Sequence, residues 1–155
     1  MKSKLYLETS VVSYLAARPS KDPIMAGHQF STRRWWKEKR SGYEVFISFM
    51  VWQEAGKGDK FAAERRLKLI RSFRWLQRTA PVARLADALV DQKAIPAIAA
   101  DDAMHIALGA VYGVEFLLTW NFTHINNPAT EEHIRSICRQ HDSHCPVICT
   151  PDQLL

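Results

Sequence analysis

Residues 99–120, with the sequence AADDAMHIALGAVYGVEFLLTW, join an apolar helix directly to an apolar strand. The segment 99–112 is apolar almost all round, as expected for a helix packed in the middle of a protein. Gly113 ends this helix, and residues 114–120 form an apolar run of the kind found in strands of buried parallel sheets. Because such a sheet needs helices on both faces, this stretch indicates an α/β fold.

The rest of the chain continues the alternation of strands and helices. Further strands are predicted over residues 4–7, 44–48, 73–76 (at a sheet edge) and 146–150. Further helices are predicted over residues 11–16, 25–40, 60–71, 82–93 and 130–139, with one more following Ser48 and carrying Glu54. Thr9 or Ser10 is expected to cap the first helix, and Pro19 and Pro23 to close it. Without a linker or internal repeat, residues 1–155 are expected to form a single domain, a three-layer α/β/α sandwich with a mainly parallel central sheet.

Composition sets broad limits on function. The 155 residues carry a formal net charge of +5, which mildly favours a polyanionic partner. The apolar stretch before Glu8 is only three residues long, and no apolar run approaches membrane-spanning length, so a cytoplasmic protein is expected. Three cysteines near the end of the chain match no common zinc spacing and are interpreted as reduced thiols: Cys138, Cys145 and Cys149.

Four polar residues fall where an α/β fold would gather them. Glu8 follows the first predicted strand, Glu54 lies in the helix after the second, Asp102 opens the apolar helix, and Asn121 follows the apolar strand. Open parallel sheets bind ligands beyond the carboxyl ends of their strands, so these side chains are expected to meet in one crevice. Clustered acids repel one another unless a cation is present, and hard oxygen ligands suit Mg²⁺ or Mn²⁺. The pattern predicts a metal site of Glu8, Glu54, Asp102 and Asn121.

Each of these residues also has a purely structural interpretation. Glu8 could cap the following helix, and Glu54 could be a solvated helix residue. Asp102 could interact with the helix dipole, a role open equally to Asp101, and Asn121 could be a turn residue. Four such coincidences in this order are less probable than one shared site.

Two histidines near these residues are ambiguous. His105 follows Asp102 by three residues and shares its helix face, which allows it to support the site, but a core histidine with a satisfied hydrogen bond is the commoner case. His124 is interpreted as a loop residue.

The ordered set of residues resembles a known family. The segments LYLETSVV (5–12), DAMHIA (102–107) and LTWN (118–121), with Glu54 between the first two, are similar to the signature of PIN domains. Within that family they resemble most the VapC-like toxins of bacterial toxin–antitoxin pairs. The resemblance extends over essentially the whole chain.

This resemblance implies a Mg²⁺- or Mn²⁺-dependent endoribonuclease that cleaves RNA phosphodiester bonds with a metal-activated water. It also implies a homodimer and a cognate antitoxin as partners. By position, Glu8, Glu54, Asp102 and Asn121 match the four acidic residues of the family, with Thr9 and Thr119 expected to hydrogen-bond the carboxylates. The first and fourth positions are usually Asp. Because Glu8 is longer and Asn121 lacks a charge, a catalytically impaired PIN-like module that binds RNA or protein is the alternative.

Other enzyme classes fit less well. A small-molecule enzyme on a flavodoxin-like sheet is disfavoured because neither Gly-x-Gly-x-x-Gly nor Gly-Lys-Ser/Thr occurs. A haloacid-dehalogenase-type phosphatase needs a nucleophilic Asp after the first strand, where this chain has Glu8.

The segment RRWWK (33–37) interleaves cations and aromatic rings. It could stack on and neutralise single-stranded RNA, or it could be an amphipathic helix whose tryptophans fill the core or a dimer contact. The second interpretation is favoured for Trp36, with the cations left as candidate phosphate contacts.

Overall fold

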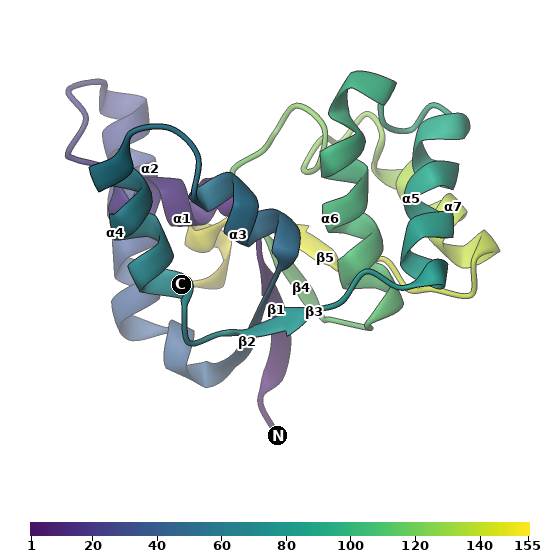
Figure 1. Cartoon of the computed structure of the whole chain (residues 1–155), viewed down its shortest axis with the longest axis horizontal. Coiled ribbons are helices and arrows are strands. Elements are labelled where there is room, and N and C mark those ends of the chain that lie inside the picture. Colours follow the sequence, from purple (N-terminus) through teal and green to yellow (C-terminus); the bar gives the residue numbers. More distant parts are fainter.

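Five parallel strands form one sheet between two layers of helices in the computed structural model, which describes residues 1–155 (Figure 1). The strands are β1 (Ser3–Leu7), β2 (Tyr43–Ser48), β3 (Arg74–Leu76), β4 (Phe116–Leu118) and β5 (Val147–Cys149). Their order across the sheet is β3-β2-β1-β4-β5, and every neighbouring pair is parallel. The α/β three-layer prediction is thereby confirmed.

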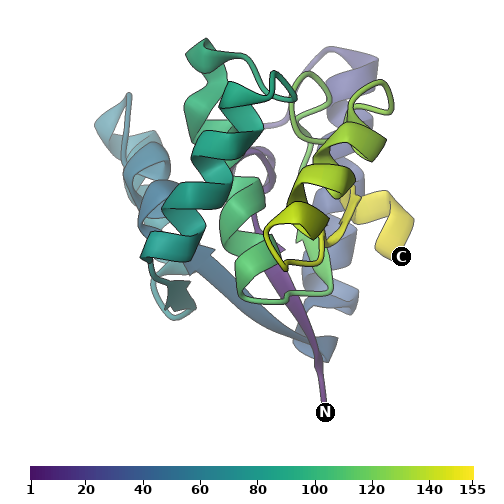
Figure 2. The same cartoon turned by 90° about the vertical axis from the view of Figure 1, so that its right-hand side faces the viewer.

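The helices that connect β1 to β2 and β2 to β3 cover one face of the sheet, and those that connect β3 to β4 and β4 to β5 cover the other. One layer holds α1 (Thr9–Ala16), α2 (Pro23–Glu38), α3 (Phe49–Ala55) and α4 (Lys60–Ile70), on the left in Figure 1. The other holds α5 (Ala80–Asp91), α6 (Ala100–Val111) and α7 (Glu131–Gln140), which face the viewer in Figure 2. Short 3₁₀ turns complete the chain at Arg40–Gly42, Ala97–Ala99 and Pro151–Leu154. None of the helices combines the length and apolarity needed to cross a bilayer.

The strand order creates a switch point at the centre of the sheet. From β1 the chain steps outward through β2 to β3, and then crosses back to β4 on the other side of β1. Leu7 and Leu118 are in register as the last residues of β1 and β4, and the Glu8 N–H still donates to the Leu118 carbonyl at 3.1 Å. Residues that directly follow these two strands therefore share the crevice in which such folds bind ligands.

The predicted elements all form, but three local details differ from the sequence-based expectation. Pro23 does not close a helix; it lies in the first turn of α2, where its missing N–H is harmless, and Asp22 caps that helix. The cap of α1 is Glu8, neither Thr9 nor Ser10. Strand β4 is shorter than predicted, because the Trp120 N–H donates to the Ser10 hydroxyl instead of a strand partner.

The tryptophans of the RRWWK segment belong to the interior of the protein. Trp35 is fully buried, and Trp36 is half-buried, with its ring covered by the Arg40 guanidinium at 4.7 Å. Trp36 packs against the core, as favoured from the sequence, and the fully buried Trp35 offers no exposed ring face for a base. The cysteines are also buried, and none forms a disulfide.

Candidate metal centre

Glu8 closes β1 and opens α1, so one residue links the sheet to the first helix. Its side chain is almost completely buried, at 5% exposure. Oε1 accepts hydrogen bonds from the hydroxyls of Ser10 and Thr119, both at 2.5 Å, and Oε2 accepts one from the Ser10 N–H at 3.1 Å. The capping interpretation of Glu8 is thus correct, and the same carboxylate lies in the crevice at the carboxyl edge of the sheet.

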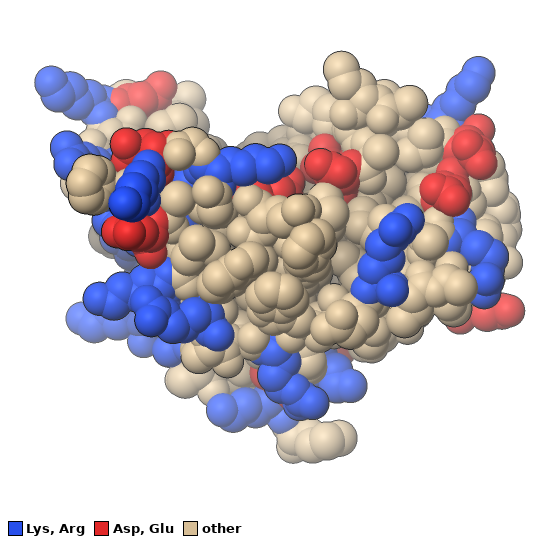
Figure 3. Space-filling model, in the orientation of Figure 1, with Lys and Arg blue, Asp and Glu red and all other residues tan.

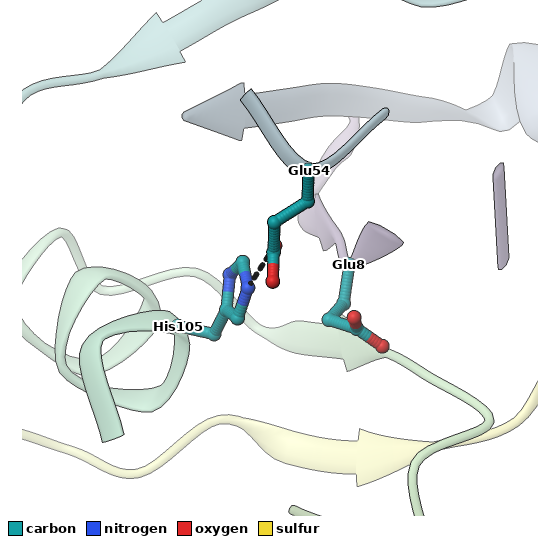
Figure 4. Close-up of side chains that lie close together, drawn as sticks. All are labelled: Glu8, Glu54 and His105. Atoms are coloured by element: carbon teal, nitrogen blue, oxygen red, sulfur yellow. Dashed lines mark hydrogen bonds and ion pairs between the residues drawn. The ribbon is translucent and has the colours of Figure 1, made fainter. Parts of the chain in front are cut away.

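Glu54 reaches the same crevice from the last turn of α3. Its Oε1 accepts hydrogen bonds from the Thr9 hydroxyl at 2.7 Å and from Nε2 of His105, also at 2.7 Å. One possible ligand atom from each of Glu8, Glu54 and His105 lies within 4.8 Å of the others. In Figure 4 the Glu54 carboxylate lies between the His105 ring and Glu8. The expectation that Thr9 and Thr119 hydrogen-bond the carboxylates is confirmed: Thr9 donates to Glu54 and Thr119 to Glu8.

His105 is fully buried and forms part of a chain of hydrogen bonds that connects Ser48 and Tyr6 to Glu54. Its Nδ1 lies 2.7 Å from the Tyr6 hydroxyl, which in turn lies 2.7 Å from the Ser48 hydroxyl. Both ring nitrogens are therefore engaged, and the ring orients Glu54. Sequence reasoning left His105 undecided; its spacing from Asp102 was the signal that it belongs here.

The charges of this pair stabilise each other. Burial alone would lower the pKa of His105, but the hydrogen bond to Glu54 and the charges of Glu8, Glu54 and Asp102 outweigh burial and raise it. Burial alone would raise the pKa of Glu54, but the hydrogen bond and charge of His105, with smaller contributions from Thr9 and Lys57, lower it.

The Tyr6 hydroxyl can be tested as the link that fixes His105. Tyr6→Phe keeps the ring in the core but removes the hydroxyl that contacts both Ser48 and His105. We expect the free energy of unfolding to fall by about 1–3 kcal/mol, because two buried polar groups lose a partner. Urea denaturation measures it. The control is Tyr43→Phe, since the Tyr43 hydroxyl makes no hydrogen bond; equal effects of the two changes would show that the chain adds no stability.

Asp102 lies in the first turn of α6, and its Oδ2 is 3.0 Å from Nδ1 of His124. Asp101 is exposed and lines a separate cavity beside Phe49 and Met50, so the two neighbouring aspartates face different surroundings. The part of Asp102 in metal binding stays a prediction. His124 is more than a loop residue, because its ring contacts one of the predicted metal ligands.

Asn121 lies at the same edge of the sheet but forms a turn. Its N–H donates to the Thr119 hydroxyl at 2.9 Å, and its Oδ1 accepts from the His124 N–H at 3.1 Å. The turn interpretation of Asn121 is therefore correct, and its part in metal binding stays a prediction.

The donor set fits a hard divalent cation. The carboxylates of Glu8 and Glu54 meet with His105 in the crevice, whereas Asp102 lies outside this group of three and Asn121 is not part of it. Glu54 Oε2 and Asp102 Oδ1 accept no hydrogen bond within the protein. In the orientation of Figure 1, the molecular surface is hollowed between the two helical layers, and acidic side chains are visible in the hollow (Figure 3). Carboxylate oxygens with one supporting imidazole are donors that Mg²⁺ and Mn²⁺ accept.

The loop between α3 and α4 holds a cation close to this hollow. Arg66 donates to the carbonyls of Ala55 and Lys57 and so fixes the loop. Lys57 is exposed, and its charge contributes to the lowered pKa of Glu54. An anionic ligand at the crevice would meet this ammonium group.

Comparison with known proteins adds no identification: no protein-family model, no curated protein and no solved structure matches this chain.

Proposed function

We propose that this protein is a Mg²⁺- or Mn²⁺-dependent endoribonuclease of the PIN-domain type, similar to VapC toxins. The observation that carries the proposal is the meeting of Glu8 and Glu54 at the central switch point, within 4.8 Å and braced by hydroxyl donors and His105. Two carboxylates that lie close together in a partly buried crevice repel each other, and a bound cation would relieve that repulsion. The resemblance of the sequence to PIN domains supplies the reaction class.

The protein's own residues have distinct roles in this proposal. Glu8, Glu54 and Asp102 would hold the metal, directly or through water, with Asn121 as a further candidate. When bound, such an ion lowers the pKa of a coordinated water and neutralises charge on phosphoryl oxygens. Thr9, Thr119 and His105 keep the carboxylates in fixed orientations, which is the usual contribution of groups that contact metal ligands.

The same resemblance brings two protein partners into the proposal. One is a second copy of this chain in a homodimer, and the other is a cognate antitoxin that would hold the nuclease inactive. A cytoplasmic location accompanies this role.

A second candidate is a catalytically impaired PIN-like module that binds RNA or protein. Two contacts favour it: Asp102 Oδ2 is engaged by His124 and Asn121 Oδ1 by the turn, which leaves fewer free oxygens for a metal. This candidate predicts an RNA affinity that chelation does not change.

Cleavage assays on a broad RNA pool test the proposal. Wild-type protein with Mn²⁺ or Mg²⁺ should cleave, and chelator should stop cleavage. Asp102→Asn should lose activity, whereas Asp101→Asn, the same charge change on the neighbouring exposed residue, should keep it. Inertness of the wild type together with absence of metal binding would refute the nuclease and favour the binding module.

Metal binding can also be measured through stability. A ligand that binds only the folded state at a hundred times its Kd adds about 2.7 kcal/mol, which for a domain of this size raises Tm by roughly 5–11 °C. We expect Mn²⁺ to produce such a rise in scanning calorimetry, and chelator to reverse it. Glu54→Gln should abolish the rise, and Asp101→Asn should preserve it. An equal rise in both variants would place the bound ion elsewhere.

A further inference from the structure

Four aromatic residues form a continuous ledge beside the candidate metal centre: Tyr14, His28, Trp120 and Phe122. The His28 and Trp120 rings are stacked, with centroids 4.1 Å apart and an interplanar angle of 19°. Tyr14 packs against both rings at 5.8 Å. Phe122 lies edge-on to the stack, 6.2 Å from His28 and 6.1 Å from Trp120. The aromatic ledge thus has a buried base and an outer rim.

The rim of the ledge is open to solvent. Phe122 is 49% exposed, whereas Trp120 beneath it is only 7% exposed and donates from Nε1 to the Thr32 hydroxyl at 2.8 Å. The exposed Phe30 and Phe61 have no aromatic neighbour, and the exposed Phe49 pairs with Trp75 at 6.4 Å, whereas Phe122 contacts two rings that are themselves stacked. Phe122 therefore packs on the rings of His28 and Trp120, while about half of its own surface is exposed to solvent.

Hydrogen bonds connect the ledge to the candidate centre on both sides of Phe122. On one side, the Trp120 N–H donates to the Ser10 hydroxyl at 2.8 Å, and that hydroxyl donates to Glu8. On the other side, His124 contacts Asp102. The short segment that carries Phe122 is thus linked through Ser10 to Glu8 and through His124 to Asp102, so its backbone is anchored to two of the predicted metal ligands.

We propose that Phe122, supported by the His28–Trp120 stack, is a base-stacking subsite for one unpaired nucleobase of the RNA that lies across the crevice. The inference rests on the proposed nuclease function and deepens it by assigning a residue that positions the substrate. A phosphate at the metal site leaves the adjoining base beside the crevice, where an aromatic face is the surface that any base can contact. A base paired in a duplex offers no free face, so the subsite selects single-stranded segments.

The test compares the affinity of a short oligouridylate with that of an abasic sugar–phosphate chain of equal length. Fluorescence anisotropy at low salt, in chelator, measures binding without cleavage. Stacking of one base contributes about 1–3 kcal/mol, so wild-type protein should bind the base-bearing strand about 5- to 150-fold more tightly. Phe122→Ala should lose this preference while keeping its affinity for the abasic strand, and Phe122→Trp should retain the preference.

Phe61→Ala is the matched control, since Phe61 is an exposed phenylalanine on α4 with no aromatic neighbour. It should behave as the wild type. An unchanged preference in Phe122→Ala, or equal affinity of the wild type for the base-bearing and abasic strands, would overturn the subsite. Failure of the nuclease proposal is distinguishable, because it appears as inert wild-type protein in the metal-dependent assay, whatever the effect of Phe122→Ala on binding.

Discussion

Replacing Glu54 with glutamine is expected to lower the rate of Mn²⁺-dependent RNA cleavage by at least about a hundredfold. Changes to groups that merely contact metal ligands already lower affinity or activity about 10- to 100-fold, and Glu54 is a proposed ligand itself. The amide oxygen of glutamine can still accept hydrogen bonds from Thr9 and His105, so the local structure should persist. The loss should therefore reflect missing charge at the crevice.

Glu64→Gln on α4 is the matched control, because it removes the same charge from an exposed residue outside the crevice. Initial rates at several Mn²⁺ concentrations, with circular dichroism to verify folding, would separate weaker metal binding from weaker chemistry. If Glu54→Gln cleaved RNA as fast as Glu64→Gln at every concentration, Glu54 would not be a ligand.

Trp35→Ala is expected to lower the free energy of unfolding by about 3–5 kcal/mol, a large part of the stability of a typical domain. The Trp35 ring is fully buried, with the rings of Tyr43 and Trp36 at centroid distances of 6.0 and 6.4 Å. No protein acceptor lies within hydrogen-bonding distance of its Nε1, so the loss comes from packing. Chemical denaturation followed by circular dichroism measures it.

Lys37→Ala separates stability from RNA contact on the same helix. Lys37 is exposed, and its removal should change the free energy of unfolding by less than about 0.5 kcal/mol. If it binds a phosphate, the same change should weaken RNA binding and reduce its salt dependence. A small stability change for Trp35→Ala, accompanied by a large loss of RNA affinity, would restore the stacking interpretation of the RRWWK segment.

The fold was accessible from sequence because its strands are short apolar runs between amphipathic helices. The segment 114–120 was recognisable as a parallel strand because an apolar helix preceded it, although only residues 116–118 form β4. The positions of Glu8 and Asn121 followed from the same logic, since a residue directly after a parallel strand must lie at the carboxyl edge. The ends of the helices were harder to predict. A proline can stop one helix or occupy the first turn of the next, and at Pro23 the Asp22 cap shows that it begins α2.

The partners of the site residues could not be predicted in the same way. That His105 would bond Tyr6 on one side and Glu54 on the other depends on how α6 packs against β1 and α3, which no local pattern encodes. The pairing of Asp102 with His124 depends likewise on the turn that Asn121 forms after β4. The positions of Glu8 and Glu54 near the sheet edge could be predicted from sequence, whereas their hydrogen-bond partners depend on tertiary packing.

Glu8 has two roles, as the cap of α1 and as a candidate metal ligand. These roles affect which residues would change first in descendants that no longer needed the proposed chemistry. As the cap of α1 and the acceptor of hydroxyls from Ser10 and Thr119, Glu8 remains under selection for folding after any nuclease activity has gone. Asp102 has fewer structural roles: its side chain hydrogen-bonds His124 and places a negative charge in the first turn of α6. Descendants would thus keep an acid at position 8 longer than at position 102, so a retained Glu8 alone is no record of activity.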